Sequence, residues 1–402
     1  MKIVVKNKEI GGAKMNKLVN KFNEQLSKIA VSEIRAFDDR VSGIEGLVKL
    51  TIGEPDFDTP EHIKQAGIKA IEENYSHYGG MRGLIDARVA ISEFFEKKYN
   101  TKYNPETEIL ITVGATEAIT ATLLSILNPG DKVLLPTPAY PGYHPIFTFA
   151  KAEAVEIDTA KNGFVLSPEM IDKAMAEHGD KVKAIILNYP CNPTGVTYKR
   201  DEIMAIADTL KKYDIFVISD EIYSELTYGE PHVSIGEYLP EQTIIITGLS
   251  KSHAMTGWRI GFIMAPEVLV TQLIKMHQYM VVSPTTISQR ATIAAMREGF
   301  NDAVSMREDY RQRRDFVFNK LTELGFEVAR PDGAFYIFAK IPANCIQDSM
   351  EFCVDLAFKN KVGVIPGSAF GVSGRGYIRI SYAASMQMLE IALERIADYV
   401  NG

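Results

Sequence analysis

The 402-residue sequence lacks several features that mark particular classes of protein. Its three cysteines show neither CxxC spacing nor a paired framework, which is typical of a reducing compartment, so we expect a cytoplasmic protein. It contains no run of about 20 apolar residues, so we expect no membrane span. The seven histidines show neither HxH nor HExxH spacing, so no metal site is expected. The net charge of −7 argues against nucleic acid as a partner.

Residues 1–14 read MKIVVKNKEIGGAK, a basic segment without the apolar stretch of a secretory signal. We interpret it as a mobile leader or an upstream start, with Met15 as a second plausible start. The whole chain is 46% apolar and 24% charged, which is typical of a soluble globular protein.

The middle of the chain alternates between strand and helix patterns. Short apolar runs typical of buried strands occur at 108–113, 132–135, 182–187, 215–219, 243–247 and 260–264. This alternation predicts an α/β fold whose mainly parallel sheet is covered by helices on both faces.

Helical spacing predicts further elements at both ends of the chain. The predicted helices lie at 16–37, 61–73, 84–99, 267–278 and 285–324, the last being long enough to bridge two domains. From about Phe326 the order reads strand, strand, helix, strand, helix. We expect a leader, an N-terminal segment that packs with the small domain, a large cofactor-binding domain and a small C-terminal domain, at 1–14, 15–60, 61–290 and 291–402.

The stretch from Thr243 to Met264 places a lysine and an arginine just beyond a buried strand. Lys251 stands among small residues, and Arg259 follows eight positions later. An amine in a water-poor crevice can lose its proton and become a nucleophile, and a guanidinium can grip a phosphate. A lone lysine after a strand is more often a solvated loop residue. An amine beside a phosphate clamp suits an aldehyde cofactor with a phosphate tail, which is pyridoxal 5′-phosphate (PLP).

Gly114-Ala115-Thr116 lies between a strand and the start of a helix. Amides without partners and the helix dipole attract an anion at such a place. The triplet is weak evidence alone, but its position ahead of Lys251 and Arg259 is that of a phosphate loop. We expect the Ala115 and Thr116 amides, Ser250 and Arg259 to hold the phosphate.

Asp220 and Tyr223 follow the strand at 215–219, at the edge where open α/β sheets bind ligands. A carboxylate there can keep a ring nitrogen protonated, and the tyrosine can hydrogen-bond the ring hydroxyl. Ile222 could pack on one face of the cofactor ring, with Tyr140 on the opposite face. A helix N-cap is the alternative role for Asp220.

Arg379 interrupts the apolar strand at 377–382. A charge in such a strand is costly unless it is paired. A buried salt bridge is therefore one explanation of Arg379.

These motifs resemble those of the class I and II aminotransferases, which are fold type I PLP-dependent enzymes. The likeness is carried by Gly248-Leu249-Ser250-Lys251, by Gly257-Trp258-Arg259-Ile260-Gly261 and by Asn192-Pro193-Thr194-Gly195, and it extends from about Asn16 to the C-terminus. The family pattern allows Ser or Gly three residues before the lysine. Gly248 stands there, so one possible hydroxyl contact is missing and Ser250 takes more of that role.

The resemblance implies a large domain with a mainly parallel seven-stranded sheet, and a smaller α+β domain. It implies PLP bound covalently to Lys251, with Asp220 and Tyr223 as the other catalytic residues. Tyr140 would stack on the ring, and Asn192 would contact the ring oxygen and the substrate.

The resemblance also implies contacts to the substrate and to a second subunit. Gly53 and Arg379 would bind the substrate, with Arg379 on its α-carboxylate. Tyr78 would reach the partner's cofactor phosphate across a two-fold homodimer, although an interface or core tyrosine explains this residue equally well.

The expected reaction is a ping-pong transfer of an amino group from an L-amino acid to a 2-oxo acid, with 2-oxoglutarate as acceptor. Aspartate-specific relatives place a cation near the substrate side chain, whereas Thr116 and the segment 278–280 stand where one is expected. A neutral, aromatic-lined pocket favours an aromatic amino acid, but it could also admit N-acetyl-LL-diaminopimelate. The chain most resembles the aromatic amino acid aminotransferases of lactic acid bacteria and the bacillus-type N-acetyl-LL-diaminopimelate aminotransferases.

Two other classes of protein use the same fold. A carbon–sulfur β-lyase would use the same lysine and arginines and release ammonia and pyruvate. A regulator with an aminotransferase-like domain would need a basic DNA-binding extension, for which residues 1–14 are too short.

Overall fold

The computed structural model describes residues 18–402, and its largest sheet has seven strands in the order β2-β8-β7-β6-β5-β3-β4. The pairs β3–β4, β3–β5, β5–β6 and β6–β7 are parallel, whereas β8 runs antiparallel to β2 and β7. The strand bounds are β2 Ile109–Thr112, β3 Lys132–Thr137, β4 Glu153–Asp158, β5 Val182–Asn188, β6 Phe216–Asp220, β7 Thr243–Gly248 and β8 Gly261–Met264. The predicted α/β fold with a mainly parallel seven-stranded sheet is confirmed.

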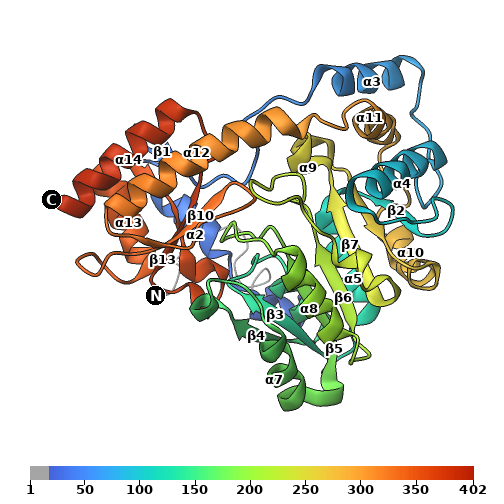
Figure 1. Ribbon diagram of the computed structural model, residues 1–402, viewed down its shortest axis with the longest axis horizontal. Coiled ribbons are helices and arrows are strands. Elements are labelled where there is room, and N and C mark those ends of the chain that lie inside the picture. The colour runs from blue at the N-terminus through green and yellow to red at the C-terminus, as the bar shows by residue number, and fades with distance from the viewer. Residues whose placement is uncertain (1–17) are drawn as a thin grey trace.

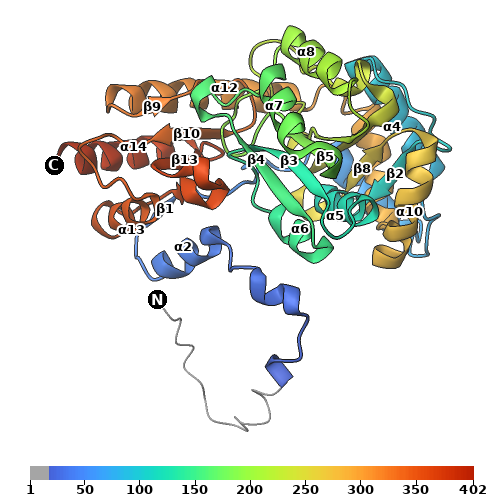
Figure 2. The same ribbon diagram turned by 90° about the horizontal axis from the view of Figure 1, so that it is seen from below.

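Helices cover both faces of this sheet, as Figure 2 shows. One face carries α5 Gly114–Ile126, α6 His144–Ala150 and α10 Glu267–Val281, and the other carries α7 Pro168–His178 and α8 Arg200–Leu210. Successive side chains of a strand point to opposite faces. Accordingly, Ile244 and Ile246 of β7 join the core under α5, whereas Ile245 joins the core of the opposite face.

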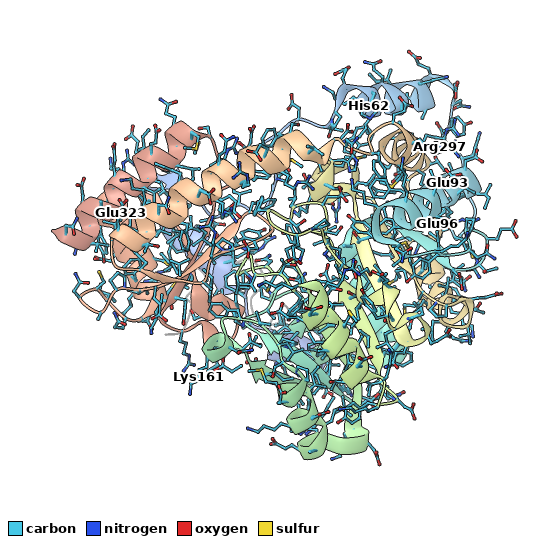
Figure 3. All side chains as sticks on the ribbon, viewed as in Figure 1. His62, Glu93, Glu96, Lys161, Arg297 and Glu323 are labelled. Atoms are coloured by element: carbon cyan, nitrogen blue, oxygen red, sulfur yellow. The ribbon has the colours of Figure 1, made fainter. Side chains whose placement is uncertain are left out.

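Three helices cover the β2 end of the sheet. They are α3 Glu61–Glu72, α4 Ile85–Tyr99 and α11 Thr286–Arg297. On their outer side, Arg297 of α11 lies 3.7 Å from Glu93 of α4, and both residues are labelled in Figure 3. Such an exposed ion pair contributes about 0–1 kcal/mol to the free energy of unfolding. The packing of these helices therefore depends mainly on apolar residues such as Ile91 and Phe94.

A second, four-stranded sheet has the order β12-β13-β10-β9 and is antiparallel (Figure 1). Its elements and covering helices are β9 Glu327–Val328, β10 Tyr336–Lys340, β12 Ile365–Pro366, β13 Tyr377–Ser381, α12 Ala303–Glu323, α13 Ser349–Asn360 and α14 Met386–Asn401. The N-terminal helix α2, Glu33–Val41, buries Phe37 and Val41 in the same core. Strand β1, Val48–Lys49, pairs in parallel with β11, Val362–Gly363. The predicted boundaries at residues 60 and 290 stay predictions.

Two of the predicted helices are wrong in extent. The helix expected over 16–37 is interrupted: Leu18 and Val19 are helical, a 3₁₀ turn follows at Glu24–Lys28, and α2 begins at Glu33; positions 16 and 17 lie outside the described residues. Phe22 is 67% exposed, so the apolar spacing ahead of α2 has no core to pack against, and spacing alone does not stabilise a helix.

The helix expected over 285–324 is two helices, with α11 ending at Arg297 and α12 beginning at Ala303. The chain turns at Gly299, where an added Cβ would lie 2.6 Å from the Ala295 carbonyl oxygen. A single glycine within a helical pattern was the only local sign of this turn.

The edge strand β4 was not predicted. Its sequence, Glu153-Ala154-Val155-Glu156-Ile157-Asp158, alternates with charged residues, and three of its six residues are exposed. Strands at the edge of a sheet often carry such charges, which obscures their apolar pattern. Within residues 18–402, no helix combines the length and apolar character needed to cross a membrane.

Candidate active site

The carboxyl ends of six strands lie at one edge of the large sheet. Strands β2, β3, β4, β5, β6 and β7 all end there, and β8 begins there because it runs the opposite way. A cavity of about 340 Å³ lies at this edge, facing the smaller sheet. It is lined by Gly53, Ala115, Thr116, Tyr140, Asn192, Asp220, Tyr223, Ser250, Lys251, Arg259 and Arg379, which are all of the predicted site residues except Tyr78.

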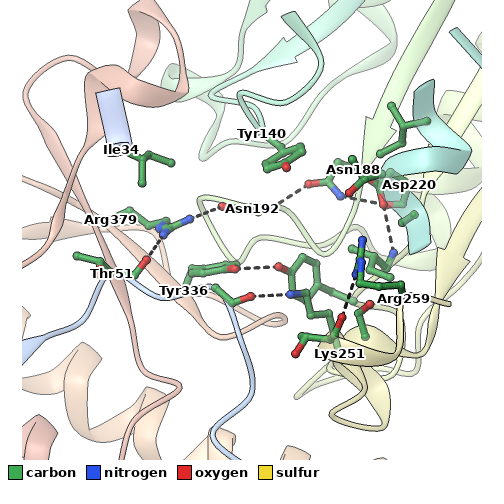
Figure 4. A pocket seen from close by; sticks show the side chains of 18 residues that line it. Ile34, Thr51, Tyr140, Asn188, Asn192, Asp220, Lys251, Arg259, Tyr336 and Arg379 are labelled. Carbon is green, nitrogen blue, oxygen red and sulfur yellow. Dashed lines mark hydrogen bonds between the residues drawn. The ribbon is translucent and has the colours of Figure 1, made fainter. Parts of the chain in front are cut away.

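Lys251 extends into the cavity from α9, Leu249–Ser252, directly after β7 (Figure 4). Its Nζ donates a 2.5 Å hydrogen bond to the carbonyl oxygen of Gly53. Burial lowers the pKa of the amine to about 8, helped by the charges of Arg259 and Arg379 and opposed by Glu54. The alternative of a solvated loop lysine is therefore wrong. A lysine with this pKa has a substantial unprotonated fraction near neutral pH.

Asp220 ends β6 with its side chain buried at the floor of the cavity. Its Oδ2 accepts a 2.6 Å hydrogen bond from the hydroxyl of Tyr143. Burial raises the pKa of the carboxyl to about 6, although the Tyr143 hydroxyl acts in the other direction. The carboxylate can thus hold a cationic N–H donor in a site with little water.

Tyr223 lies near Lys251, and its hydroxyl is 2.8 Å from the hydroxyl of Tyr336. Tyr336 comes from β10 of the smaller sheet, so this bond joins the two sheets. Burial raises the pKa of Tyr223 well above its ordinary value, so the hydroxyl keeps its proton and can donate it in a hydrogen bond.

Arg379 of β13 is buried at the other end of the cavity. Its Nη1 donates to Asn192 Oδ1 at 3.0 Å and its Nη2 to the Thr51 carbonyl at 2.7 Å. The Nε has no hydrogen-bond partner, and no carboxylate of residues 18–402 pairs with the guanidinium. The salt-bridge explanation of Arg379 is therefore wrong. A buried cation without a counterion favours binding of an anion.

The first turn of α5 and Arg259 form a cup at one side of the cavity. The amides of Gly114, Ala115 and Thr116 have no acceptor within the helix, because the first turn offers none. An added Cβ at Gly114 would lie 2.6 Å from Arg259 Nη2, so only glycine allows the guanidinium to approach this closely. Gly114 also has a φ of 77°, which favours glycine.

Tyr78 lies outside the cavity and is 84% exposed. The structure therefore does not bring it together with the other predicted residues in one chain. Tyr140 and Ile222 both line the cavity, as predicted for residues on either side of a flat ligand.

Sequence reasoning missed several residues of the site. Tyr143 binds Asp220, Tyr336 binds Tyr223, and Asn188 Oδ1 accepts from the Asn192 amide at 3.0 Å. Further missed residues line the cavity, namely Ile34, Thr51, Ile119 and Thr256. Tyr143 and Asn188 lie within four residues of predicted ones, so proximity was a usable signal for them. Thr51 had the same signal, since it lies two residues from Gly53, whereas Ile34 comes from a distant segment and had none.

The family model "Aminotransferase class I and II" matches residues 45–396. The chain belongs to the class I and II aminotransferases. A Bacillus subtilis relative, "Probable N-acetyl-LL-diaminopimelate aminotransferase", is 45% identical over 94% of this chain and 95% of its own. The "Aromatic-amino-acid aminotransferase 2" of Thermococcus litoralis is 38% identical over 93% of this chain and 97% of its own.

A solved structure of the aspartate aminotransferase from Thermus thermophilus with maleate has the same architecture. It superimposes with a TM-score of 0.88 at 35% identity, covering 94% of this aminotransferase and 99% of that chain. The relatives thus share the fold and the reaction type, but their names differ in substrate.

Aminotransferases of this family depend on PLP, and the cavity fits that cofactor. The cup at α5 and Arg259 suits its phosphate, and the glycine that the cup requires is present. Asp220 suits its ring nitrogen and Lys251 its aldehyde. Among residues 18–402, no cluster of three His, Cys, Asp or Glu side chains is arranged to hold a metal ion.

Proposed function

We propose that the enzyme transfers the amino group of an aromatic L-amino acid to a 2-oxo acid, with 2-oxoglutarate as the acceptor, in a ping-pong reaction. One observation carries the proposal: the cavity holds an amine of lowered pKa, Lys251, and a buried guanidinium, Arg379, that no carboxylate of residues 18–402 neutralises. An amino acid brings a carboxylate for Arg379 and an amino group for the reaction near Lys251.

Ten residues of the cavity have a proposed contact with PLP. Lys251 would hold the cofactor covalently, Asp220 would face the ring nitrogen, and Tyr223 and Asn192 would bond the ring hydroxyl. Tyr140 and Ile222 cover the two faces of the ring. The phosphate is held by Ala115, Thr116, Ser250 and Arg259. When bound, PLP supplies an aldehyde for the amino group and a ring that accepts electrons from the substrate α-carbon.

The free amine of Lys251 would act as the base. It takes the proton that leaves the substrate α-carbon, while Arg379 and Asn192 hold the carboxylate. A pKa of about 8 leaves about a tenth of such amines unprotonated at pH 7. The Gly53 carbonyl, 2.5 Å from Nζ, keeps the amine near the substrate.

The proposed preference for an aromatic side chain follows from the charges of the cavity. Its three cations, Lys251, Arg259 and Arg379, all have roles in the steps above. Within the described chain, no cation therefore remains in the cavity for a side-chain carboxylate. Tyr140 and Tyr336 supply aromatic faces, and Ile34 and Ile119 supply apolar ones.

N-acetyl-LL-diaminopimelate is the second candidate donor. The observation that favours it is the 45% identity with the Bacillus subtilis relative that carries this substrate in its name. Its distal end carries an uncharged amide and also a carboxylate, for which the described lining of the cavity offers no further cation.

A donor panel with 2-oxoglutarate separates these candidates. The panel compares kcat/KM for phenylalanine, tyrosine, tryptophan, aspartate and N-acetyl-LL-diaminopimelate. Pyruvate serves as a second acceptor, because the side-chain carboxylate of 2-oxoglutarate also finds no free cation in the described lining of the cavity. We expect phenylalanine to exceed aspartate by about tenfold or more, since a buried unpaired charge is costly. A marked preference for N-acetyl-LL-diaminopimelate would establish the second candidate, and a preference for aspartate would refute both. Pyruvate released from cystathionine without any oxo acid would reveal a β-lyase.

We further propose that the enzyme is a cytoplasmic homodimer in which Tyr78 contacts the phosphate bound by the neighbouring subunit. The 84% exposure of Tyr78, outside the cavity of its own chain, supports this role. Light scattering should give twice the chain mass of 44.7 kDa, and a monomer would contradict the proposal.

A further inference from the structure

A buried pair of titratable side chains lies directly behind the phosphate cup. Glu117 belongs to the first turn of α5, and its Oε1 is 3.0 Å from Nδ1 of His277 on α10. The His277 side chain is completely buried, and that of Glu117 is 7% exposed. The reaction proposed above does not use either residue.

The contacts of His277 suit a positively charged ring. Its Nε2 lies 2.9 Å from the carbonyl oxygen of Met81, and its Nδ1 faces the Glu117 carboxylate. Both ring nitrogens therefore face acceptors, and only the imidazolium has a donor on each nitrogen. The contacts are those of a buried ion pair, in which each charge compensates the other.

The pair also fixes the segments that surround the cup. The second carboxylate oxygen of Glu117 accepts a 3.0 Å hydrogen bond from the amide of Val113, the residue that precedes α5. His277 fixes the loop at Met81, three residues from Tyr78. One pair thus connects α10, the loop before α4 and the start of α5.

The carboxylate of Glu117 is unexpected in the first turn of α5, because the same turn is proposed to bind a phosphate. Two anions in a site with little water repel each other. The amides of Ala115 and Thr116 attract a phosphate, whereas an uncompensated Glu117 would weaken that attraction.

We propose that His277 is a positioning residue for the cofactor phosphate, which it serves by neutralising Glu117 and holding that carboxylate on the Val113 amide. The inference rests on the proposed binding of PLP. It predicts an effect that depends on the phosphate, whereas a merely structural pair would affect every ligand of the site equally.

The test compares PLP with pyridoxal, which lacks the phosphate. The full-length protein, freed of cofactor, is titrated with each compound, and binding is followed by the fluorescence of Trp258, the single tryptophan of the chain and the neighbour of Arg259. His277→Gln should weaken PLP binding by about tenfold, the order expected for one uncompensated charge, and pyridoxal binding by less than about twofold.

Removing the carboxylate as well should reverse the loss. The double variant His277→Gln/Glu117→Gln should bind PLP within about threefold of the wild type, because no charge is then left unpaired. Glu117→Gln alone should also stay within about threefold, which keeps the test informative if His277→Gln fails to fold.

The matched control is His232→Gln, which breaks a second buried His–Glu pair, His232 Nε2 to Glu221 Oε2 at 2.8 Å, beside Asp220 rather than beside the cup. Any loss in this variant should be equal for PLP and pyridoxal. Equal losses of both ligands in His277→Gln, or a double variant as weak as the single one, would overturn the inference. A wild-type protein that binds no PLP would instead refute the proposed function.

Discussion

Tyr336 contacts two parts of the active site with two different parts of its side chain. Its hydroxyl bonds the hydroxyl of Tyr223 at 2.8 Å, and its ring lies 4.5 Å from the guanidinium carbon of Arg379. Hydrogen-bonded hydroxyl groups polarise each other, so a Tyr336 hydroxyl that donates to Tyr223 strengthens the bond that Tyr223 can donate to the cofactor. The ring, by contrast, stabilises the guanidinium of Arg379, to which we assign the substrate carboxylate.

We therefore expect two substitutions of Tyr336 to separate these effects. Tyr336→Phe keeps the ring and should lower kcat by about two- to tenfold, the worth of one hydrogen bond, with little change in KM. Tyr336→Leu also removes the aromatic face and should additionally raise KM for the amino acid. Steady-state kinetics with one donor checks this. Equal changes in kcat and KM for the two variants would show that the hydroxyl and the ring do not act separately.

Among the elements, the start of β8 and the start of α5 approach each other unusually closely. An added Cβ at Gly261 would lie 2.5 Å from the Gly114 carbonyl carbon and 2.6 Å from the Ala115 nitrogen. These are backbone atoms, so the clash cannot be relieved by rotating a side chain. The close approach brings Arg259, two residues before Gly261, to the amides of α5.

Gly261→Ala should consequently push α5 away from Arg259. We expect a loss of about 1–3 kcal/mol in the free energy of unfolding, as for other overpacked sites, together with weaker PLP binding. Calorimetry and a PLP titration measure the two effects. Gly257→Ala is the control, because an added Cβ there meets no described heavy atom within 4 Å. If the two variants are equally stable, the close packing at Gly261 is not what holds the cup together.

The elements also show what the sequence can and cannot predict. Strand β7 and the Lys251 loop were predictable, because five apolar or small residues in succession and the spacing of Lys251 and Arg259 are local signals. The turn at Gly299 was not, since the periodic pattern continues on both sides of it. The charged edge strand β4 was missed for a similar reason, because its apolar residues are interrupted by Glu153, Glu156 and Asp158.

Some residues of the site could be predicted from the sequence and others could not, for a physical reason. Residues that follow a strand of the large sheet, such as Asp220 and Lys251, reach the cavity because parallel strands end at one edge. Tyr336 and Ile34 come from the smaller sheet and the N-terminal helix α2, and only tertiary packing brings them to that edge. Their sequences resemble those of ordinary core residues.

At the scale of the whole molecule, the cavity exists because two sheets with different cores face each other. The large sheet supplies the amine of Lys251 and the carboxylate of Asp220, whereas β13 of the smaller sheet supplies the guanidinium of Arg379. The bonds from Arg379 to Asn192 and from Tyr336 to Tyr223 cross between them. The proposed function thus assigns the substrate carboxylate to a residue of the smaller sheet and the chemistry to residues that follow strands of the large one.

We propose that Lys251, and no other lysine of the chain, carries the cofactor. The most direct measurement is reduction of the purified full-length protein with borohydride, which makes the bond between lysine and cofactor permanent, followed by digestion and mass spectrometry. The account predicts a phosphopyridoxyl group on the peptide that contains Lys251, and its absence from a Lys251→Ala variant treated in the same way. The same group on another lysine of the wild-type protein, with Lys251 unmodified, would contradict the account.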